Sequence, residues 1–290
     1  MDRLQVAIER ARKQRAEVLK ESAGAGPLTD VSSVPAATPR RETEAPAPSS
    51  RDALWASLKP IDAEAPELRN NRMMSYKGGA QAAPYDLLRT RMLHQIRQNN
   101  WRYIGVVSPT AECGKTTAAA NLAFAFSNHP ELRMILLDLD LRRPSLARIM
   151  GQKVEHGMQD VLRGQTDFAD HARRLGDNVA IGYNNGPARN PSELLQSNQT
   201  EEQIAAITRR FDPDLMLIDL PPMMSTDDNY GFLSKVDAVL LMVAAEQSSN
   251  DQIEVALRHL GDLTTVMGIV LNKCRHFGGA YGYDNKYYYS

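Results

Sequence analysis

The sequence predicts an α/β domain built on a doubly wound, mostly parallel sheet. Three observations predict it. Short runs of continuous apolar residues alternate with helical patterns along most of the chain. A glycine-lysine-threonine turn follows the first of these runs, and aspartates end two others. Continuous apolar strands separated by helices are typical of parallel sheets that helices cover on both faces.

The expected elements follow in chain order. Apolar runs predict strands at 103–107, 134–137, 215–218, 239–243 and 268–271. Spacings of three and four residues predict helices at 84–98, 115–127, 227–235 and 249–260. These elements predict an ordered domain over residues 80–277.

The regions outside this domain differ in composition. Residues 2–21 predict a helix with Leu4, Ala7, Ile8 and Ala11 on one face, either solvated or docking on a partner or an anionic lipid surface. Residues 22–79 are rich in Ala, Pro, Ser, Thr and Glu, which predicts a disordered linker. Residues 278–290 predict a flexible tail.

Composition narrows the functional classes. The net charge of −1 over 290 residues gives no reason to expect a nucleic-acid partner. Two cysteines, Cys113 and Cys274, are too few for a disulfide framework and fit a reducing compartment. No apolar run reaches the roughly 20 residues of a membrane span, and the first residues are too charged for a signal peptide. We therefore expect a cytoplasmic protein.

The turn after the first predicted strand has the core of a Walker A phosphate loop. Backbone N–H groups at the start of the next helix would face phosphates, aided by the helix dipole. Lys115 would reach the phosphates, and the Thr116 hydroxyl would bind Mg²⁺. Glu112 would repel phosphates unless it points outward. The predicted phosphate-binding residues are Ala111, Glu112, Cys113, Gly114, Lys115, Thr116 and Thr117.

Acidic motifs end two later strands. The sequence DLDLR places Asp138, Asp140 and Arg142 at alternate positions after the strand at 134–137. Asp219 ends the strand at 215–218, as in a Walker B motif. Because ligands bind at the carboxyl ends of parallel strands, these carboxylates are expected to hold Mg²⁺ or to accept a proton from an attacking hydroxyl.

Together these motifs resemble the bacterial tyrosine kinases of capsule and exopolysaccharide assembly, of the stand-alone cytoplasmic type. The matching segments are SPTAECGKTT, DLDLR, LIDLPP, NPSELL, GIVLNK and the tyrosine-rich end, over about 200 residues. The resemblance implies a phosphate-loop NTPase fold that transfers the γ-phosphate of ATP to tyrosine with Mg²⁺. It implies Lys115, Asp138 and Asp140 as catalytic residues, with Asp138 as the base.

The same resemblance implies further site residues. Thr116, Asp138 and Asp219 would hold the metal, and Arg142 and Asn272 would contact the nucleotide. Two departures stand out. Ala111–Cys113 replace the family's Pro-Gly-Glu, which affects the expected rate. Of the family's E-x-x-R-x-x-R assembly helix only Arg89 is kept, so a ring built through that motif is not expected.

The last ten residues hold half of the ten tyrosines in the chain. Mobile tyrosines could enter a neighbour's active site, and each phosphate would add nearly two negative charges. The alternative interpretation is an aromatic tail for protein contacts. The predicted phosphate acceptors are Tyr281, Tyr283, Tyr287, Tyr288 and Tyr289.

Two other functions stay open. One is a partitioning-type ATPase related to MinD and ParA, although Thr110 stands where those proteins carry an extra lysine. The other is a nucleotide-binding regulator without efficient transfer. For the kinase, the resemblance implies a membrane polysaccharide co-polymerase as activator, recruitment to the inner face of the plasma membrane, a homo-oligomer and a cognate tyrosine phosphatase.

Overall fold

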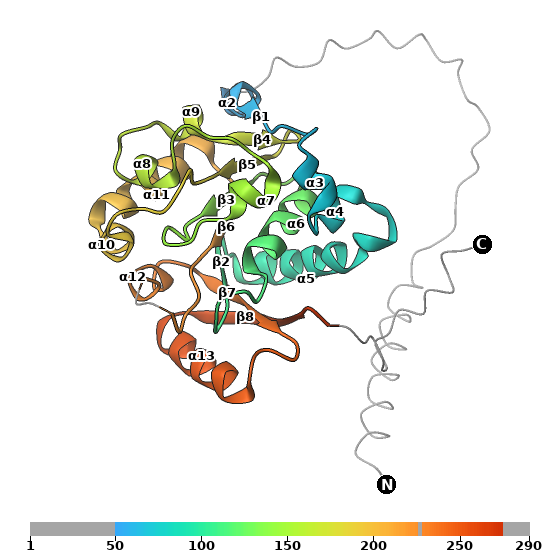
Figure 1. The fold of residues 1–290 in the computed structure, drawn as a ribbon. Helices are drawn as coiled ribbons and strands as arrows, with labels where there is room; N and C mark the ends of the chain where they lie inside the picture. The colour runs from blue at the N-terminus through green and yellow to red at the C-terminus, as the bar shows by residue number, and fades with distance from the viewer. Residues whose placement is uncertain (1–49, 226–227, 275–290) are drawn as a thin grey trace, which may run out of the picture. The chain divides into compact units, whose positions relative to one another are not determined.

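The computed structural model describes residues 50–225 and 228–274, and these are arranged around one sheet (Figure 1). In this part of the chain the sheet has eight strands in the order β1-β4-β5-β3-β6-β2-β7-β8. β4 runs antiparallel to β5, and the other neighbouring pairs are parallel. The strands are β1 (Lys59–Pro60), β2 (Tyr103–Val107), β3 (Met134–Asp138), β4 (Arg173–Leu175), β5 (Val179–Gly182), β6 (Leu215–Asp219), β7 (Ala238–Ala244) and β8 (Thr265–Asn272).

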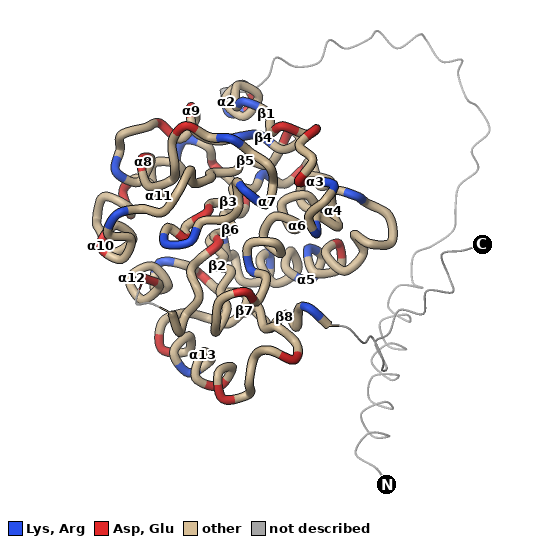
Figure 2. The backbone as a smooth tube through the Cα atoms, viewed as in Figure 1, with Lys and Arg blue, Asp and Glu red and all other residues tan. Residues whose placement is uncertain are grey.

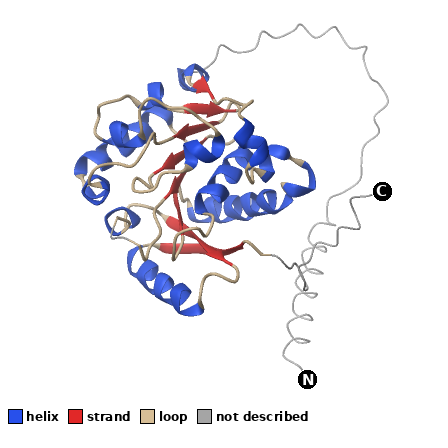
Figure 3. Ribbon diagram, in the orientation of Figure 1, coloured by secondary structure: helices blue, strands red, loops and turns tan. Residues whose placement is uncertain are grey.

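Helices cover both faces of the sheet, as Figure 3 shows. The buried residues fall into two clusters, one on each face. Helices that contribute to the first cluster are α3 (Pro66–Asn70), α5 (Ala83–Asn99), α6 (Lys115–Ser127) and α7 (Leu146–Met150), with α4 (Met74–Lys77) and the short helix η1 (Gly79–Gln81) beside them. Helices that contribute to the second are α2 (Ser50–Ser57), α8 (Met158–Leu162), α9 (Phe168–His171), α10 (Pro191–Gln196), α11 (Asn198–Phe211), α12 (Tyr230–Leu233) and α13 (Asn250–Leu263). These layers confirm the predicted doubly wound, mostly parallel fold.

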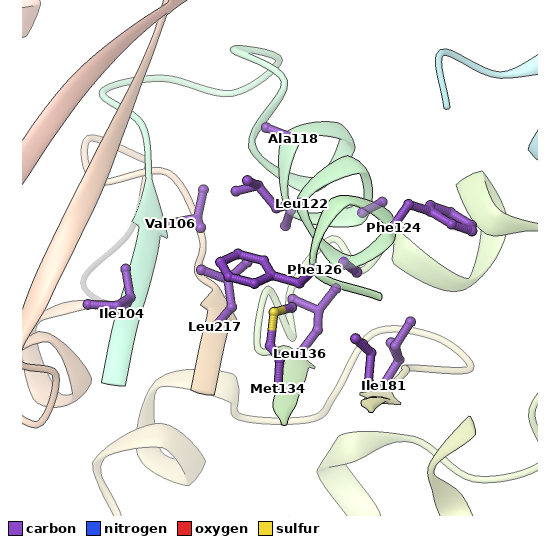
Figure 4. Packing of buried hydrophobic residues seen from close by; sticks show 14 of the residues in the cluster. Ile104, Val106, Ala118, Leu122, Phe124, Phe126, Met134, Leu136, Ile181 and Leu217 are labelled. Carbon is purple, nitrogen blue, oxygen red and sulfur yellow. The ribbon is translucent and has the colours of Figure 1, made fainter. Parts of the chain in front are cut away.

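Helix α6 begins at the phosphate loop, and most of its residues are buried. Its middle is rich in alanine, and small side chains let the helix axis lie close to the strands. Figure 4 shows Leu122 and Phe126 of α6 directed toward side chains of β2, β3 and β6, among them Val106 and Leu217. This packing fixes the start of α6, where the phosphate loop ends, relative to the strand ends.

Part of the predicted linker is folded, which corrects the expected boundary at residue 79. Residues 50–79 form α2, β1, α3 and α4, and Trp55, Leu68 and Met73 in this stretch are fully buried. The two prolines within the described part of this stretch occupy positions that tolerate them: Pro66 begins α3, and Pro60 lies in an edge strand. A few large apolar residues therefore outweigh the composition of the surrounding sequence.

The five predicted strands are confirmed as β2, β3, β6, β7 and β8; β2 has the predicted bounds, and the other four are longer by one to four residues. The helix expected at 227–235 is shorter, because α12 spans only Tyr230–Leu233. No helix in the described residues is long and apolar enough to cross a membrane. The predicted N-terminal helix and the tyrosine-rich tail lie outside the described residues.

Candidate active site

Neighbouring strand ends bring the predicted acidic residues to one edge of the sheet. β6 lies between β3 and β2. In the register of the sheet, Asp219 stands opposite Asp138 on one side and opposite Val106 on the other. The phosphate loop begins directly after β2, so both carboxylates lie at the strand ends that flank this loop. Figure 2 shows acidic and basic positions gathered at the ends of β3 and β6.

The phosphate-loop lysine lies beside these carboxylates. Lys115 is the first residue of α6, and its ammonium group is 3.9 Å from the Asp140 carboxylate. Both side chains are less than a tenth exposed. The structure therefore brings together Lys115 and Asp140, which are 25 positions apart in the sequence. The Thr116 hydroxyl lies close enough to Asp219 to lower the pKa of that carboxyl group.

The phosphate loop is curled by two residues with left-handed backbone conformations. Glu112 has φ of 64° and Gly114 has φ of 87°. The Glu112 side chain is exposed, which meets the condition for its carboxylate not to oppose phosphates. A Cβ atom at Gly114 would collide with the side-chain amide of Asn272. The backbone angle therefore favours glycine here, and the Asn272 amide would have to shift to admit a Cβ atom.

Asn272 acts on the loop backbone in this structure. It is the last residue of β8, and its Nδ2 donates a hydrogen bond of 3.0 Å to the carbonyl oxygen of Cys113. The loop is thus held to the edge strand as well as to β2. The predicted contact of Asn272 with the nucleotide stays a prediction.

The Cys113 side chain is directed to the turn after β7. Its Sγ lies 3.5 Å from the Thr110 hydroxyl and 3.7 Å from the Ser248 hydroxyl. Burial acts to raise the pKa of the Cys113 thiol, but hydrogen bonds from Thr110 and Ser248 lower it below its ordinary value overall. The Cys113 thiol packs inside the loop. At this position the backbone, and not the side chain, would contact phosphates.

The turn after β3 wraps around its own carboxylates. The backbone N–H of Leu146 donates to Asp138 at 3.3 Å, and that of Arg143 donates to Asp140 at 3.1 Å. Asn184, which follows β5, donates a hydrogen bond of 2.7 Å to the backbone carbonyl of Asp138. These bonds fix the direction of the two carboxylates of DLDLR.

Arg142, the third residue of that motif, pairs with a residue that the sequence did not single out. Its guanidinium donates two hydrogen bonds to the Asp228 carboxylate, from Nε at 2.8 Å and from Nη2 at 2.9 Å. Asp228 is fully buried and lies between β6 and α12. The sequence signal was weak, because Asp228 is 86 positions from Arg142 and precedes no recognisable motif.

Burial raises the pKa values of all three site carboxyl groups, and nearby carboxylates add to the effect. For Asp138, burial raises the pKa most, followed by the charges of Asp219 and Asp140. For Asp219, burial raises the pKa to about 6, although Lys115 and Thr116 lower it. For Asp140, burial raises the pKa more than Lys115 lowers it. Carboxyl groups with raised pKa values are suited to accept a proton near neutral pH.

The same residues fit a magnesium ion. Three buried carboxylates lie at this edge, one of them beside Lys115, and one oxygen of Asp138 and both oxygens of Asp219 receive no well-formed hydrogen bond. Buried negative charge of this kind favours a bound cation. Within the described residues there is no group of three or more His, Cys, Asp or Glu side chains placed to hold a metal alone. Mg²⁺ does not need such a group, because it is usually held by one or two carboxylates together with phosphates and water.

A family model described as the CobQ/CobB/MinD/ParA nucleotide binding domain matches residues 104–277. The chain belongs to this family. The family accounts for the fold and for a nucleotide site at the phosphate loop, and its matched region contains every site residue described above.

Curated relatives with similar sequences carry the names of tyrosine kinases, which confirms the resemblance seen in the sequence. Tyrosine-protein kinase wzc of Salmonella typhimurium is 30% identical over 194 residues, or 66% of this chain and 26% of that protein. Tyrosine-protein kinase CpsD of Streptococcus pneumoniae serotype 4 is 26% identical over 182 residues, or 62% of this chain and 79% of that protein. The chain spans about a quarter of the length of the first curated relatives it matches.

Solved structures show the same fold. The kinase domain of Escherichia coli tyrosine kinase ETK superposes with a TM-score of 0.61 at 21% identity, covering 70% of this chain and 81% of that domain. At this identity the likeness supports the fold of the domain, and the chemistry must come from the residues themselves.

Proposed function

We propose that this chain is an ATP-dependent protein-tyrosine kinase that phosphorylates tyrosines in its own C-terminal cluster. The observation that carries the proposal is the convergence of Asp138, Asp140 and Asp219 with Lys115 at the edge of the sheet beside the phosphate loop. The names of the relatives support the choice of tyrosine as the acceptor.

The residues divide the work as follows. Lys115 and the backbone of residues 111–117 bind the phosphates, and Thr116 with Asp138 and Asp219 holds Mg²⁺. The metal, when bound, neutralises charge on the phosphates of ATP. Asp138, in its ionised form, would accept the proton of the tyrosine hydroxyl; bound Mg²⁺ would offset the neighbouring carboxylates, which in the metal-free chain raise its pKa. Arg142 and Asn272 complete the set predicted to surround the nucleotide.

Lys115 changes partner in this scheme. It lies beside Asp140 in the structure, at 3.9 Å. The phosphates of ATP would pair with the Lys115 ammonium group. Asp140 would then be left to face Mg²⁺ or the acceptor. The lysine thus keeps a buried carboxylate neutralised until the nucleotide arrives.

The wider setting follows from the relatives. We propose that the kinase regulates polymerisation and export of a capsule or exopolysaccharide from the cytoplasmic side of the membrane. Its partners would be a membrane co-polymerase that activates it, further copies of the chain, and a phosphatase that resets the tail. Phosphates on Tyr281, Tyr283, Tyr287, Tyr288 and Tyr289 would repel one another and loosen the assembly.

Labelled ATP tests the proposal directly. With γ-labelled ATP and Mg²⁺, the wild-type chain should acquire label on tail tyrosines. Lys115→Met should lose at least about a hundredfold of this rate, because the phosphates lose their cation. Lys59→Met is the matched control, since Lys59 is exposed on the edge strand β1, and it should label normally.

Three results would contradict the kinase assignment. Release of free phosphate without labelled protein indicates an ATPase of the MinD and ParA type. Tight nucleotide binding without either product indicates a regulator. Label on serine or threonine, identified by mass spectrometry, would contradict the choice of acceptor.

A further inference from the structure

A buried carboxylate outside the predicted motifs joins three segments of the chain. Asp228 accepts the two hydrogen bonds from Arg142 described above, and the Ser192 hydroxyl donates to the same carboxylate. Ser192 lies in the first turn of α10, and Arg142 lies in the turn after β3. The side chain of Asp228 is 1% exposed, and that of Arg142 is 45% exposed. The bond between them is bidentate and charge-assisted, the strongest and most directional kind that arginine makes.

Neighbouring hydrogen bonds extend this junction to the segment that follows Asp219. The Asn229 side chain donates a bond of 2.6 Å to the carbonyl oxygen of Pro221. On the other side, the backbone N–H of Ala188 donates a bond of 2.8 Å to the carbonyl oxygen of Leu141. The turn after β3, the connection before α10 and the segment after β6 are therefore fastened to one another around Asp228.

The turn fastened in this way is the one that aims the site carboxylates. Arg143, next to Arg142, donates its backbone N–H to Asp140. Leu146, at the end of the same turn, donates its backbone N–H to Asp138. A shift of the Arg142 side chain would therefore move the backbone that orients both carboxylates.

We propose that Asp228 and Arg142 are positioning residues for phosphoryl transfer, and that Arg142 acts through this turn and not by binding the nucleotide. The proposal rests on the kinase function proposed above. It assigns a role to Asp228, which sequence reasoning missed, and a different role to Arg142. Loss of the pair would misplace the carboxylates by a fraction of an ångström to an ångström, a displacement that can cost about a hundredfold in rate.

Neutral, nearly isosteric variants test the pair. We would compare Arg142→Gln, Asp228→Asn and the double variant with wild type. Each single change should lower the transfer rate at saturating ATP by at least about tenfold, whereas the KM for ATP and the Kd of Mg·ADP should stay within about threefold. The double variant should be no slower than the slower single variant, because the two residues act as one unit.

Two further variants sharpen the comparison. Arg142→Lys should not restore the rate, since an ammonium group cannot form the two parallel bonds that the guanidinium makes. Arg148→Gln is the matched control: it removes an exposed cation from α7, the helix that begins at the end of the same turn. It should leave the rate within about threefold of wild type.

Two outcomes would overturn the proposal. If Arg142→Gln weakens Mg·ADP binding tenfold or more and Asp228→Asn does not, Arg142 binds the nucleotide directly. If the rate losses of the single variants multiply in the double variant, the two residues act separately.

Amide hydrogen exchange provides a readout that needs no activity. Both single variants should speed exchange in residues 139–146 and in residues 220–225 together, and leave residues 110–118 unchanged. Exchange confined to one of the two segments would contradict a shared junction. A wild-type chain without any transfer would refute the kinase function, and the exchange data would still decide whether the pair fastens the two segments.

Discussion

Replacing Asp219 with asparagine should make the metal-free protein more stable at alkaline pH. Asp219 is fully buried, it stands beside Asp138 of the neighbouring strand, and neither of its oxygens receives a well-formed hydrogen bond. Its ionised form is therefore unfavourable in the folded chain. Asparagine has nearly the same shape, carries no charge and can donate a hydrogen bond to Asp138.

The size of the effect follows from the pKa of Asp219, which burial raises from 3.8 to about 6. That difference corresponds to about 3 kcal/mol, at 1.36 kcal/mol for each tenfold change. Because the folded pKa lies above the unfolded one, the penalty is absent below about pH 4, grows as the pH rises, and is complete above about pH 6. Asp219→Asn should thus be about 3 kcal/mol more stable than wild type at pH 8 and equally stable at pH 4.

Urea unfolding at the two pH values measures this difference. With a denaturant slope of about 3 kcal/mol/M, the midpoint at pH 8 should rise by about 1 M. Asp228→Asn is the matched control. It also neutralises a buried aspartate, but one that Arg142 already pairs with, so it should lower the midpoint.

Magnesium bound with ADP should reduce the stability advantage of Asp219→Asn over wild type. In the wild type, ADP with Mg²⁺ should raise the urea midpoint more than ADP alone, because the bound cation offsets the buried charge. In Asp219→Asn the added effect of Mg²⁺ should be lost. A variant at pH 8 that is no more stable than wild type would refute the reasoning that this carboxylate is strained by burial, and an undiminished magnesium effect would refute its role as a ligand.

Three further predictions concern other parts of the chain. Gly114→Ala should destabilise the fold by about 1–3 kcal/mol and abolish nucleotide binding, because alanine is strained at φ of 87° and its Cβ meets Asn272; unaltered ADP binding by calorimetry would contradict this. Trp55→Ala should cost about 3–5 kcal/mol in urea unfolding, because it removes a buried ring and its 2.9 Å hydrogen bond to the carbonyl of Phe211; a cost below 1 kcal/mol would show that residues 50–57 are not part of the core. Burial lowers the pKa of His171 to about 4, so this side chain alone should lower the stability of wild type by about 2 kcal/mol between pH 7 and pH 5, as the unfolded chain takes up a proton first; the stability of His171→Gln relative to wild type should therefore rise by about 2 kcal/mol over the same range in urea unfolding.

The strands that carry the site could be predicted because burial on both faces leaves a plain signal. β2, β3 and β6 are continuous apolar runs, and each leads into a motif whose chemistry is readable. β4 and β5 gave no such signal. β4 is three residues long and begins with two arginines at the sheet's antiparallel pairing, and β5 is only four residues long.

The limits of sequence reasoning at the site have a physical cause as well. Carboxylates that follow predicted strands can be placed, since strand ends share an edge of the sheet. Residues in long connections cannot, because nothing in their local pattern fixes where the connection runs. Asp228 and Asn184 both lie in such connections, and both contact the DLDLR turn. The folded stretch around Trp55 was missed for a related reason: Leu54, Trp55 and Leu58 have helical spacing, but they are too few to stand out from the proline-rich sequence around them.

The hydrogen bond between Asn272 and Cys113 connects the end of β8 to the phosphate loop. The side chain that steadies the phosphate loop sits two residues before Cys274, the last described position, and the tyrosine-rich sequence comes next in the chain. Any tension on that sequence, from a partner or from another copy of the chain, acts first on the strand that ends in Asn272. The Asn272 side-chain amide would then couple the conformation of the phosphate loop to the binding of the tail.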